Sequence, residues 1–556
     1  MGRLTRALGL VALVAAGALV TVVSPLAAAP PLKFGPIVYV DQSLAGGEPF
    51  VIQSLQHGTL LYSSHEGTTH IYRPGLPGYA AGIFAANYRN QVNNWVSTDG
   101  GKTWKFVSVL GSGFAPIPVQ NSGFSDPDLT ADEGGRLYNT GINLANTSLF
   151  SSGDGGKSFD RGNLQCASGD RPWLAGGAAD NVFMSDNLNI GGHQVVHSGD
   201  GGTTCDAKVP FSGGLAGGGV QADGTLNNIP WSGVGKLYYD HKDGSLVEPA
   251  IFQNPGTTVG LGFDYLAHAQ AAFPADGTKS FTPKVVVPST TLFSHWPAMT
   301  IDSDQNVYLV WDTDDRASDT GGCNSTGSAT ANKVLMVTGK HVGPQQWTWS
   351  APITVAAPAK GRVLWPWVAV GAPGNVSVVW YQYDKVVDPD CATDGNVFIY
   401  DSHILGLFSG APTTTVTNAS DRPISSKGIC QGGTGCVASG KDRRLGDFFT
   451  NAIDDKGCVM IVSGDTTLPD PVTGGDQPIS HPIFIRQLTG PSLTGGNCAG
   501  TSAGATTPAS LATTGAGSGG TPNTAGQSPG TWGVLLGLLA LAGALTALGW
   551  RLRRAV

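Results

Sequence analysis

The chain has 556 residues and a net charge of −8; only 13% of its residues are charged, while 80 are glycine and 13 are tryptophan. Lys and Arg form no basic stripe, so nucleic acid is not an expected partner. Short apolar runs separated by Gly, Asp, Asn and Pro dominate, and long amphipathic helical stretches are absent, which predicts an all-β protein.

The N-terminal segment has the layout of a secretory signal peptide. Two arginines in MGRLTR precede the apolar run LGLVALVAAGALVTVV, and the small-residue segment SPLAAAP follows. This order of basic, apolar and small residues predicts a signal peptide over residues 1–29, cleaved near Ala28 or Ala29. An uncleaved N-terminal anchor is the alternative. Either way, the main part of the chain is expected to be exported.

A short box recurs along the first half of the chain. It reads STDGGKTW from Ser97, SSGDGGKSF from Ser151, HSGDGGTTC from His197 and, in a degenerate form, ADGTKSF from Ala275. The Asp side chain can accept backbone N–H bonds across a tight turn, and Gly tolerates the positive φ that such turns need. We therefore expect a structural hairpin turn whose aromatic residue drops into an apolar layer. The box positions are Ser97, Asp99, Gly101, Trp104, Asp154, Gly156, Phe159, Asp200, Gly202 and Asp276.

A second repeat alternates with the box. Its copies begin at Asp126, Asp170, His295, Leu364 and, more loosely, Gly446, and each pairs two apolar runs around a Gly, Asp or Asn turn. Each copy predicts a β-hairpin, and a hairpin followed by a box hairpin gives four antiparallel strands, the unit of a propeller blade. We expect a monomeric β-propeller over residues 30–493, with six or seven blades and seven favoured. The N- and C-terminal strands are expected to close one blade together.

Eight cysteines lie in the segment expected to be exported. An even number of cysteines in an oxidising compartment predicts disulfides, and no spacing suggests zinc. Pairing in chain order is the simplest arrangement, which gives 166–205, 323–391, 430–436 and 458–498. The eight residues are Cys166, Cys205, Cys323, Cys391, Cys430, Cys436, Cys458 and Cys498.

The C-terminal part predicts a tether. Residues 494–531 are rich in Gly, Ala, Ser, Thr and Pro and read as a flexible stalk. Residues 532–550 are apolar and uncharged and match the length of a transmembrane helix, so the arginines of the 551–556 tail would lie in the cytoplasm. Within the stalk, Leu511, Ala512, Thr513, Thr514 and Gly515 resemble the sorting signal of class E sortases. Attachment to the cell wall and plain membrane anchoring both remain open.

The boxes resemble the Asp-box (BNR) repeats of the sialidase superfamily, over roughly residues 45 to 490. This resemblance implies a site with three arginines for the substrate carboxylate, a Tyr nucleophile with a Glu partner, and an Asp acid/base. Arg73, in IYRPGLP, matches the first arginine. The remaining arginines have candidates at Arg171, Arg316, Arg362, Arg422, Arg443 and Arg444.

The expected acid of that site is missing. Residues 74–98 contain neither Asp nor Glu, so the loop that should carry the acid/base has no group to deliver a proton. Among the four glutamates of the chain, Glu248 is the plausible partner for a Tyr nucleophile. Arg73, Arg171 and Glu248 are therefore the candidate catalytic residues, with Arg171 more simply explained as a blade-edge residue paired to an Asp.

Other chemistries have less support. The two histidines of HEGTTH (residues 65–70) are five apart, not the four that a zinc-binding helix needs. The acidic run 312–322 could bind a structural Ca²⁺, although it lacks the EF-hand spacing, so no cofactor is expected. The sequence thus predicts a non-catalytic, surface-anchored propeller that binds a glycan or a cell-surface protein through loops on one face. A divergent exo-sialidase or another exo-acting glycoside hydrolase is the alternative.

Overall fold

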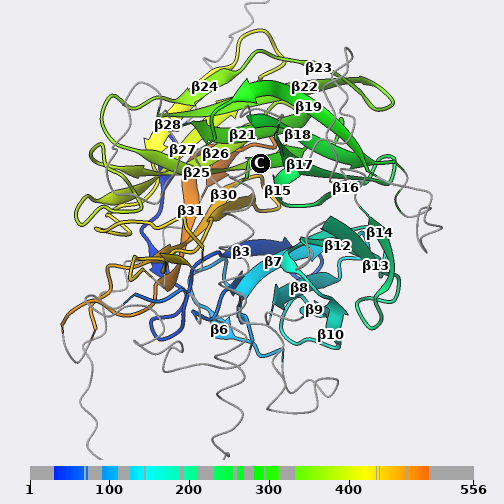
Figure 1. Cartoon of the computed structure of the whole chain (residues 1–556), viewed down its shortest axis with the longest axis horizontal. Helices are drawn as coiled ribbons and strands as arrows, with labels where there is room; N and C mark the ends of the chain where they lie inside the picture. Colours follow the sequence, from blue (N-terminus) through cyan, green and yellow to red (C-terminus); the bar gives the residue numbers. More distant parts are fainter. Residues whose placement is uncertain are drawn as a thin grey trace, which may run out of the picture.

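The computed structural model describes residues 30–67, 70–72, 91–109, 125–142, 146–187, 193–210, 231–253, 259–267, 269, 281–292, 296–313, 332–433, 435–436, 439–470 and 474–499. Thirty-two strands in these ranges form seven antiparallel sheets, which are the blades of one β-propeller. In Figure 1 the chain colours run in order from one blade to the next. The predicted all-β propeller is confirmed, with seven blades.

Each blade begins with a strand next to the propeller axis and continues outward. Blade 1 consists of β3 (Phe50–Ser54), β4 (Thr59–Ser64), β5 (Asn93–Ser97) and β6 (Lys105–Phe106). Blade 2 consists of β7 (Ser125–Ala131), β8 (Leu137–Ile142), β9 (Thr147–Ser152) and β10 (Arg161–Ala167). Blade 3 consists of β11 (Asp170–Gly176), β12 (Val182–Asn187), β13 (His193–Ser198) and β14 (Asp206–Pro210).

Blades 4 and 5 each contain a fifth strand. Blade 4 has β15 (Trp231–Val234) and β16 (Tyr238–Asp240), which both pair with β17 (Ser245–Gln253), followed by β18 (Val259–Leu266) and β19 (Thr282–Thr290). Blade 5 has β20 (Ala298–Ile301), β21 (Val307–Thr313), β22 (Lys333–Gly343), β23 (Gln346–Trp349) and β24 (Ile353–Ala356). Blade 6 has four: β25 (Val363–Val370), β26 (Val376–Tyr383), β27 (Val397–Leu405) and β28 (Thr413–Asn418).

Blade 7 closes the ring with strands from both ends of the described chain. It contains β29 (Thr450–Ile453), β30 (Val459–Asp465) and β31 (His481–Pro491), and β31 also pairs with β1 (Lys33–Phe34), β2 (Val38–Tyr39) and β32 (Asn497–Ala499). The predicted joint blade is present. Because β32 belongs to it, the propeller extends to Ala499, beyond residue 493 where the sequence placed its end.

Both sequence repeats occupy fixed places in the blades. The copies that begin at residues 126, 170, 295, 364 and 446 form the two inner strands of blades 2, 3, 5, 6 and 7. The boxes at Ser97, Ser152 and Ser198 connect the third and fourth strands of blades 1, 2 and 3, on the outer part of each blade. The fourth box, with Asp276, lies outside the described residues.

The side chains of each box hold its turn from within. In the first copy, Asp99 Oδ1 accepts hydrogen bonds from the backbone N–H groups of Lys102 and Thr103 at 3.0 and 2.9 Å. Ser97 Oγ accepts one from the N–H of Gly101 at 2.9 Å. The serine-to-glycine and Asp-to-backbone bonds recur in the second and third copies. The box is therefore a turn-stabilising motif, as the sequence predicts.

The box also joins neighbouring blades. Each of the three boxes in the described residues contains two adjacent glycines after its Asp. The carbonyl oxygen of the first accepts a hydrogen bond from a side chain of the preceding blade. The second packs against an apolar side chain of that same blade. Blade 1 is held in this way to blade 7, so the box also contributes to closing the ring. The pairs are Arg486 with Gly100, Thr59 with Gly155 and Ser151 with Gly201, at 3.0, 2.6 and 2.6 Å.

Trp104 is less buried than a ring dropped into a closed apolar layer would be. Its ring packs edge-on against Tyr62 at 5.7 Å and Phe484 at 5.3 Å between centroids, and its Nε1 donates to the carbonyl of Gly101. The side chain nevertheless remains partly exposed at the blade edge. It is a structural residue at the seam between blades 1 and 7.

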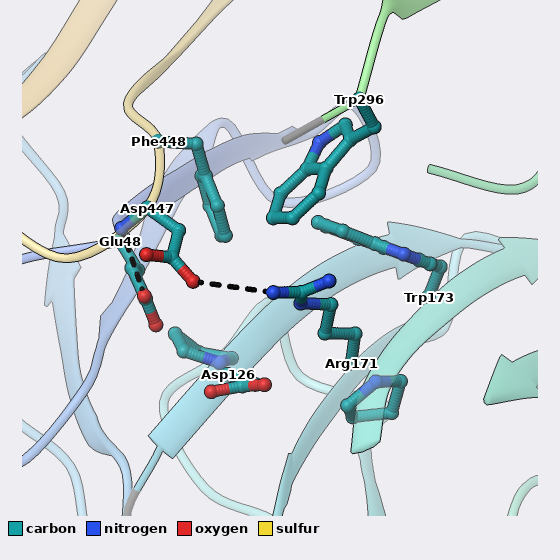
Figure 2. Close-up of a pocket in the computed structure, with 9 residues that line it drawn as sticks. Glu48, Asp126, Arg171, Trp173, Trp296, Asp447 and Phe448 are labelled. Atoms are coloured by element: carbon teal, nitrogen blue, oxygen red, sulfur yellow. Dashed lines mark hydrogen bonds and ion pairs between the residues drawn. The ribbon is translucent and has the colours of Figure 1, made fainter. Parts of the chain in front are cut away.

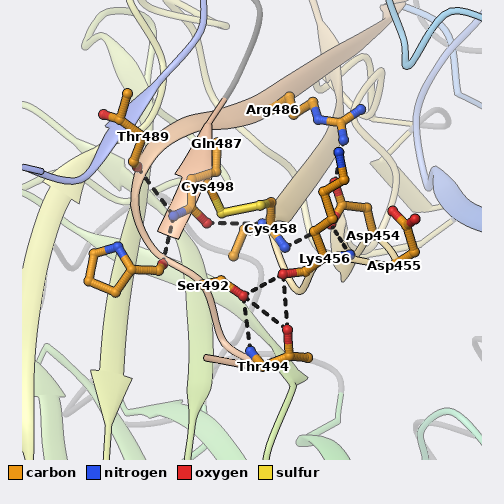
Figure 3. The surroundings of a disulfide bond; sticks show 12 residues. Asp454, Asp455, Lys456, Cys458, Arg486, Gln487, Thr489, Ser492, Thr494 and Cys498 are labelled. Atoms are coloured by element: carbon orange, nitrogen blue, oxygen red, sulfur yellow. Dashed lines mark hydrogen bonds and ion pairs between the residues drawn. A yellow bond between two sulfur atoms is a disulfide. The ribbon is translucent and has the colours of Figure 1, made fainter. Parts of the chain in front are cut away.

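Three of the four predicted disulfides are present among the described residues. They join Cys166 to Cys205, Cys430 to Cys436 and Cys458 to Cys498. Cys391 is also disulfide-bonded, and its predicted partner, Cys323, lies outside the described residues. Figure 3 shows the third bridge, which ties β32 to the start of β30 in the closing blade.

The predicted signal peptide (1–29), most of the stalk (500–531, with Leu511 to Gly515) and the apolar segment 532–550 lie outside the described residues. Within the described part of the chain, no helix is long and apolar enough to cross a membrane.

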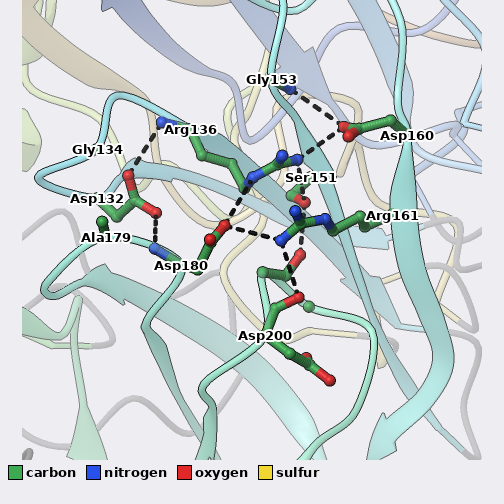
Figure 4. A network of polar contacts seen from close by, with 12 residues as sticks. Asp132, Gly134, Arg136, Ser151, Gly153, Asp160, Arg161, Ala179, Asp180 and Asp200 are labelled. Carbon is green, nitrogen blue, oxygen red and sulfur yellow. Dashed lines mark hydrogen bonds and ion pairs between the residues drawn. The ribbon is translucent and has the colours of Figure 1, made fainter.

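Polar networks at the rim reinforce the blade order. Arg136 of blade 2 contacts Asp180 of blade 3 at 3.2 Å, and Arg161 of blade 2 contacts the same carboxylate at 2.8 Å (Figure 4). Arg161 also donates to the backbone carbonyl of Asp200 in the third box. Because these groups are partly exposed, each contact adds only a modest stabilisation.

The seam between blades 1 and 7 can be tested with two glycine substitutions. Gly101 and Gly58 both have positive φ (89° and 64°), but a Cβ on Gly101 would overlap the ring of Phe484, whereas a Cβ on Gly58 meets nothing within 4 Å. We expect Gly58→Ala to lower the free energy of unfolding by about 1–2 kcal/mol, the cost of a left-handed Ala. Gly101→Ala should cost about 1–3 kcal/mol more, measured by urea unfolding. Equal losses would contradict the inter-blade contact.

Candidate functional site

Five of the seven inner strands begin with the same three-residue arrangement, which we call the proline elbow. It consists of a residue, a proline and a following residue, at 48–50, 126–128, 171–173, 296–298 and 365–367. The residue before proline has a positive φ in four elbows: 52° at Glu48, 51° at Asp126, 56° at Arg171 and 54° at Trp365. Such values are uncommon for any residue but glycine, and residues held there concentrate at functional sites.

The strand pairing is interrupted at the same points. The register between the two inner strands shifts between Ser125 and Asp128, between Asp170 and Trp173, and between Leu364 and Trp367. A β-bulge bends its strand and redirects the side chain of the extra residue. The elbow therefore turns the residue before proline out of the sheet, toward the propeller axis.

The elbow residues converge on an axial pocket. Its lining comes from the starts of inner strands in blades 1, 2, 3, 5 and 7, and its cavity volume is about 10 Å³, room for about one water molecule. Figure 2 shows its three carboxyl groups arranged around the guanidinium of Arg171, with aromatic rings on the opposite side. The lining residues are Glu48, Asp126, Pro127, Arg171, Pro172, Trp173, Trp296, Asp447 and Phe448.

A cluster of aromatic rings closes the pocket on the side of the propeller axis. All five rings are buried and they contact one another with centroid distances of 5.4 to 6.4 Å. Three of them follow the proline of an elbow. Because the rings fill the axis, the pocket is a closed depression and not a tunnel. This aromatic floor consists of Phe50, Trp173, Trp296, Trp367 and Phe448.

A cation lies beneath the aromatic floor. Lys236 Nζ contacts both carboxylate oxygens of Asp128 at 2.7 and 2.6 Å and also donates to the backbone carbonyls of Leu129 and Leu174. The ammonium lies 5.2 Å from the centroid of the Phe50 ring. Asp128 belongs to the second elbow, so this elbow supplies an ion pair where the others supply a ring.

Asp447 is the charged carboxylate of the pocket. It forms a bidentate ion pair with Arg443, and its Oδ2 lies 3.6 Å from Arg171 Nη2. Burial by itself would lower the pKa of Arg443, but the neighbouring Asp447 raises it above its ordinary value. Two guanidinium groups thus face one carboxylate.

Glu48, in contrast to Asp447, favours the uncharged form of its carboxyl group. Its side chain is 2% exposed, and its Oε1 accepts a hydrogen bond from the backbone N–H of Asp447 at 3.0 Å and lies 3.1 Å from His70 Nε2. Its Oε2 has no hydrogen-bond partner among the described residues. Burial, and next the charge of Asp447, raise the pKa of Glu48 to about 8, although Arg443 and Arg171 oppose the shift. At neutral pH Glu48 is therefore a carboxylic acid.

The remaining titratable neighbours favour neutral forms as well. Burial, followed by the charges of Glu48 and Asp170, raises the pKa of Asp126 well above its ordinary value. His70 stacks on His65 with centroids 4.0 Å apart, and burial lowers the pKa of both rings well below the usual value. The pocket thus combines a protonated Glu48 and a second carboxyl group of raised pKa, Asp126, with a paired carboxylate and a partly exposed cation.

Arg171 gives the pocket its access to solvent. Its side chain is 25% exposed, compared with 2% for Glu48 and 6% for Asp447. The guanidinium carbon lies 4.5 Å from the centroid of the Trp296 ring, a cation–π contact. The predicted pairing of Arg171 with an Asp is present, but the residue lies at the axial pocket and not at a blade edge.

One other sequence candidate, Arg443, meets Arg171 here, because both guanidinium groups contact Asp447. Glu248 lies in β17 and is fully buried, with Oε1 2.7 Å from Nε2 of His193 in β13 and Asp264 as its cross-strand neighbour. Arg73 lies outside the described residues. No group of three or more His, Cys, Asp or Glu residues in the described ranges could hold a metal ion.

Sequence reasoning missed Glu48, Asp126 and Asp447. The signal for the first two was the repeated Xaa-Pro dipeptide at the start of an inner strand, visible in EPF and DPD as well as in DRPW, HWPA and LWPW. Asp447 has no proline after it. It is marked by Gly446, with φ of 79°, where a Cβ would overlap Glu48 Cγ.

No protein-family model matches the chain, and no curated protein matches it. Among solved structures, it is similar to an ulvan lyase of polysaccharide lyase family PL25 (11% identity, 80% of this chain and 96% of that chain, TM-score 0.41). It is similar to the GH93 α-L-arabinofuranosidase of Fusarium graminearum (14%, 82% and 98%, 0.35) and to YCF48 from Cyanidioschyzon merolae (11%, 81% and 98%, 0.39). Similarities this distant do not bear on the activity, and none assigns the chain to the sialidase superfamily.

The protonation of Glu48 predicts how stability depends on pH. Between the ordinary pKa of 4.5 and the native value of about 8, the unfolded chain loses a proton that the native protein keeps. The free energy of unfolding therefore falls as pH rises, by up to about 1.4 kcal/mol per unit from this group. E48Q removes this contribution, so urea unfolding should show E48Q gaining stability relative to the wild type between about pH 5 and pH 8. E133Q, which removes an exposed carboxyl group, is the control, and a constant E48Q difference would refute the assignment.

Proposed function

We propose that the protein binds the terminal residue of an acidic glycan in the axial pocket, with the sugar carboxylate on Arg171. The observation that carries the proposal is the guanidinium of Arg171, which lies 4.5 Å from the centroid of the Trp296 ring and is 25% exposed at the mouth of the pocket. Arginine offers two parallel N–H donors that match a carboxylate. Its contact with Asp447 at 3.6 Å is long enough for a ligand carboxylate to compete for the same donors.

The rest of the lining suits a sugar ring. Trp296 and Phe448 present aromatic rings, and the carboxyl groups of Glu48 and Asp126 can exchange hydrogen bonds with hydroxyl groups. Binding sites of this kind combine apolar walls with a few convergent polar groups. The cavity volume of about 10 Å³ and the aromatic floor leave no passage for the interior of a polymer, so only the acidic end group of a terminal residue can enter.

Display at the cell surface is part of the proposal. The three disulfides among the described residues are typical of exported proteins. The predicted signal peptide and the apolar segment 532–550 support a chain that is exported and tethered behind a stalk. In such a position the pocket would meet glycans outside the cell.

Binding can be tested by calorimetric titration with oligosaccharides that end in glucuronic acid or, as matched neutral ligands, in glucose. We expect the wild type to prefer the acidic ligand. R171Q should weaken its binding at least about tenfold, the loss of a charge-assisted bond, and leave the weak binding of the neutral ligand unchanged. R161Q, which removes an arginine from the rim of the neighbouring blade, is the control.

Two results would reject the proposal. One is equal binding of the acidic and neutral ligands by the wild type. The other is an equal loss in R171Q and R161Q, because the effect would then reflect net charge and not the axial pocket.

A further inference from the structure

We infer that the axial pocket also cleaves the glycosidic bond of the acidic residue it holds, with Glu48 as the catalytic proton donor and Asp447 as the base. This inference rests on the proposed glycan binding and goes beyond it, because a binding site needs no acid. It is carried by the hydrogen bonds around Glu48 and by the different surroundings of two adjacent carboxyl groups.

The hydrogen bonds place the acidic proton. Oε1 of Glu48 accepts the N–H of Asp447 at 3.0 Å, and His70 can donate to the same oxygen from Nε2 at 3.1 Å. With the Asp447 N–H on Oε1, and His70 in the tautomer that donates to the same oxygen, we assign the acidic proton to Oε2. That oxygen is buried, has no partner among the described residues, and belongs to a residue that lines the pocket.

Asp447 supplies the complementary group. Its bidentate contact with Arg443 and the nearby Arg171 keep it ionised beside the neutral Glu48. The backbone N–H of Asp447 donates to Glu48, so the two carboxyl groups stay adjacent, one ionised and the other neutral. Environments that separate the protonation states of two neighbouring carboxyl groups are what acid–base hydrolysis needs.

The reaction is a hydrolysis and balances without a cofactor. The bond between the anomeric carbon and the leaving-group oxygen breaks, and that oxygen takes the proton from Glu48 Oε2. Water adds its oxygen to the anomeric carbon and gives its proton to Asp447. Solvent returns that proton to Glu48, and the products are the free acidic sugar and the alcohol.

The charged and titratable groups around Glu48 agree with this role. Burial and the charge of Asp447 raise the pKa of Glu48 and so disfavour its anion, while Arg443 and Arg171 limit the shift. The neutral His70 beside it adds no charge. Together these groups keep Glu48 protonated at neutral pH, and Glu48 loses its proton near pH 8.

Leaving-group dependence tests the inference on the full chain. The probes are both anomers of 4-nitrophenyl and 2,4-dinitrophenyl glucuronide, together with 4-nitrophenyl neuraminide. Glutamine mimics the protonated Glu48 in shape and charge, so E48Q should retain the fold and the binding of glucuronate. For the glucuronide that the wild type cleaves, E48Q should lower the rate on the 4-nitrophenyl compound about 10²- to 10⁴-fold. The 2,4-dinitrophenyl compound, whose leaving group needs little protonation, should lose less than about tenfold.

A matched substitution and the pH profile complete the test. E133Q should cleave like the wild type, and the wild-type rate should fall as pH rises through about 8. The inference is overturned if the wild type binds glucuronate but hydrolyses none of the probes, a result that leaves the proposed binding intact. It is also overturned if E48Q slows both leaving groups equally, because Glu48 would then act on binding or structure and not as the proton donor.

Discussion

The pocket depends on one backbone constraint, the positive φ before proline at the start of the inner strands. Proline fixes its own φ and has no N–H to donate, so the strand cannot continue in regular pairing through this point. The bulge that results turns Asp126 and Arg171 toward the axis, and Glu48, with a φ of 52°, takes the same position directly before β3. The residue after proline supplies the aromatic floor in three blades. The proline elbow thus supplies both the polar side chains at the opening of the pocket and three rings of the aromatic floor.

The elbows work only if the ring of blades holds its spacing. Glu48 and Asp447 are 399 residues apart in the chain, yet the N–H of one binds the carboxyl of the other, because β1, β2 and β31 close blade 7. The boxes tie adjacent blades at the rim, far from the pocket. The repeat that is most visible in the sequence therefore serves the scaffold, while the less visible proline repeat serves the site. This division explains why degenerate boxes are compatible with a well-formed pocket.

The sequence was sufficient for the architecture and insufficient for the site. Alternating hairpins and boxes predict four-stranded blades, because strand period and turn chemistry are local. Arg171 was singled out by a resemblance, but its neighbours come from four other blades, and no local pattern reports which blades meet. Glu48 stood outside both repeats, so a search centred on residues 74–98 found no acid although one precedes blade 1. The protonation states were also out of reach, because they depend on burial and on Asp447 and Arg443 together.

The central claim is that the axial pocket, and not the loops at large, is the place where an acidic sugar binds. A crystal structure of the protein with a glucuronate-terminated oligosaccharide tests this most directly. We expect the sugar carboxylate on Arg171, the ring beside Trp296 and a hydroxyl or glycosidic oxygen within hydrogen-bond distance of Glu48 Oε2. A ligand bound at the blade rim or on the outer loops, with the axial pocket unchanged, would contradict it.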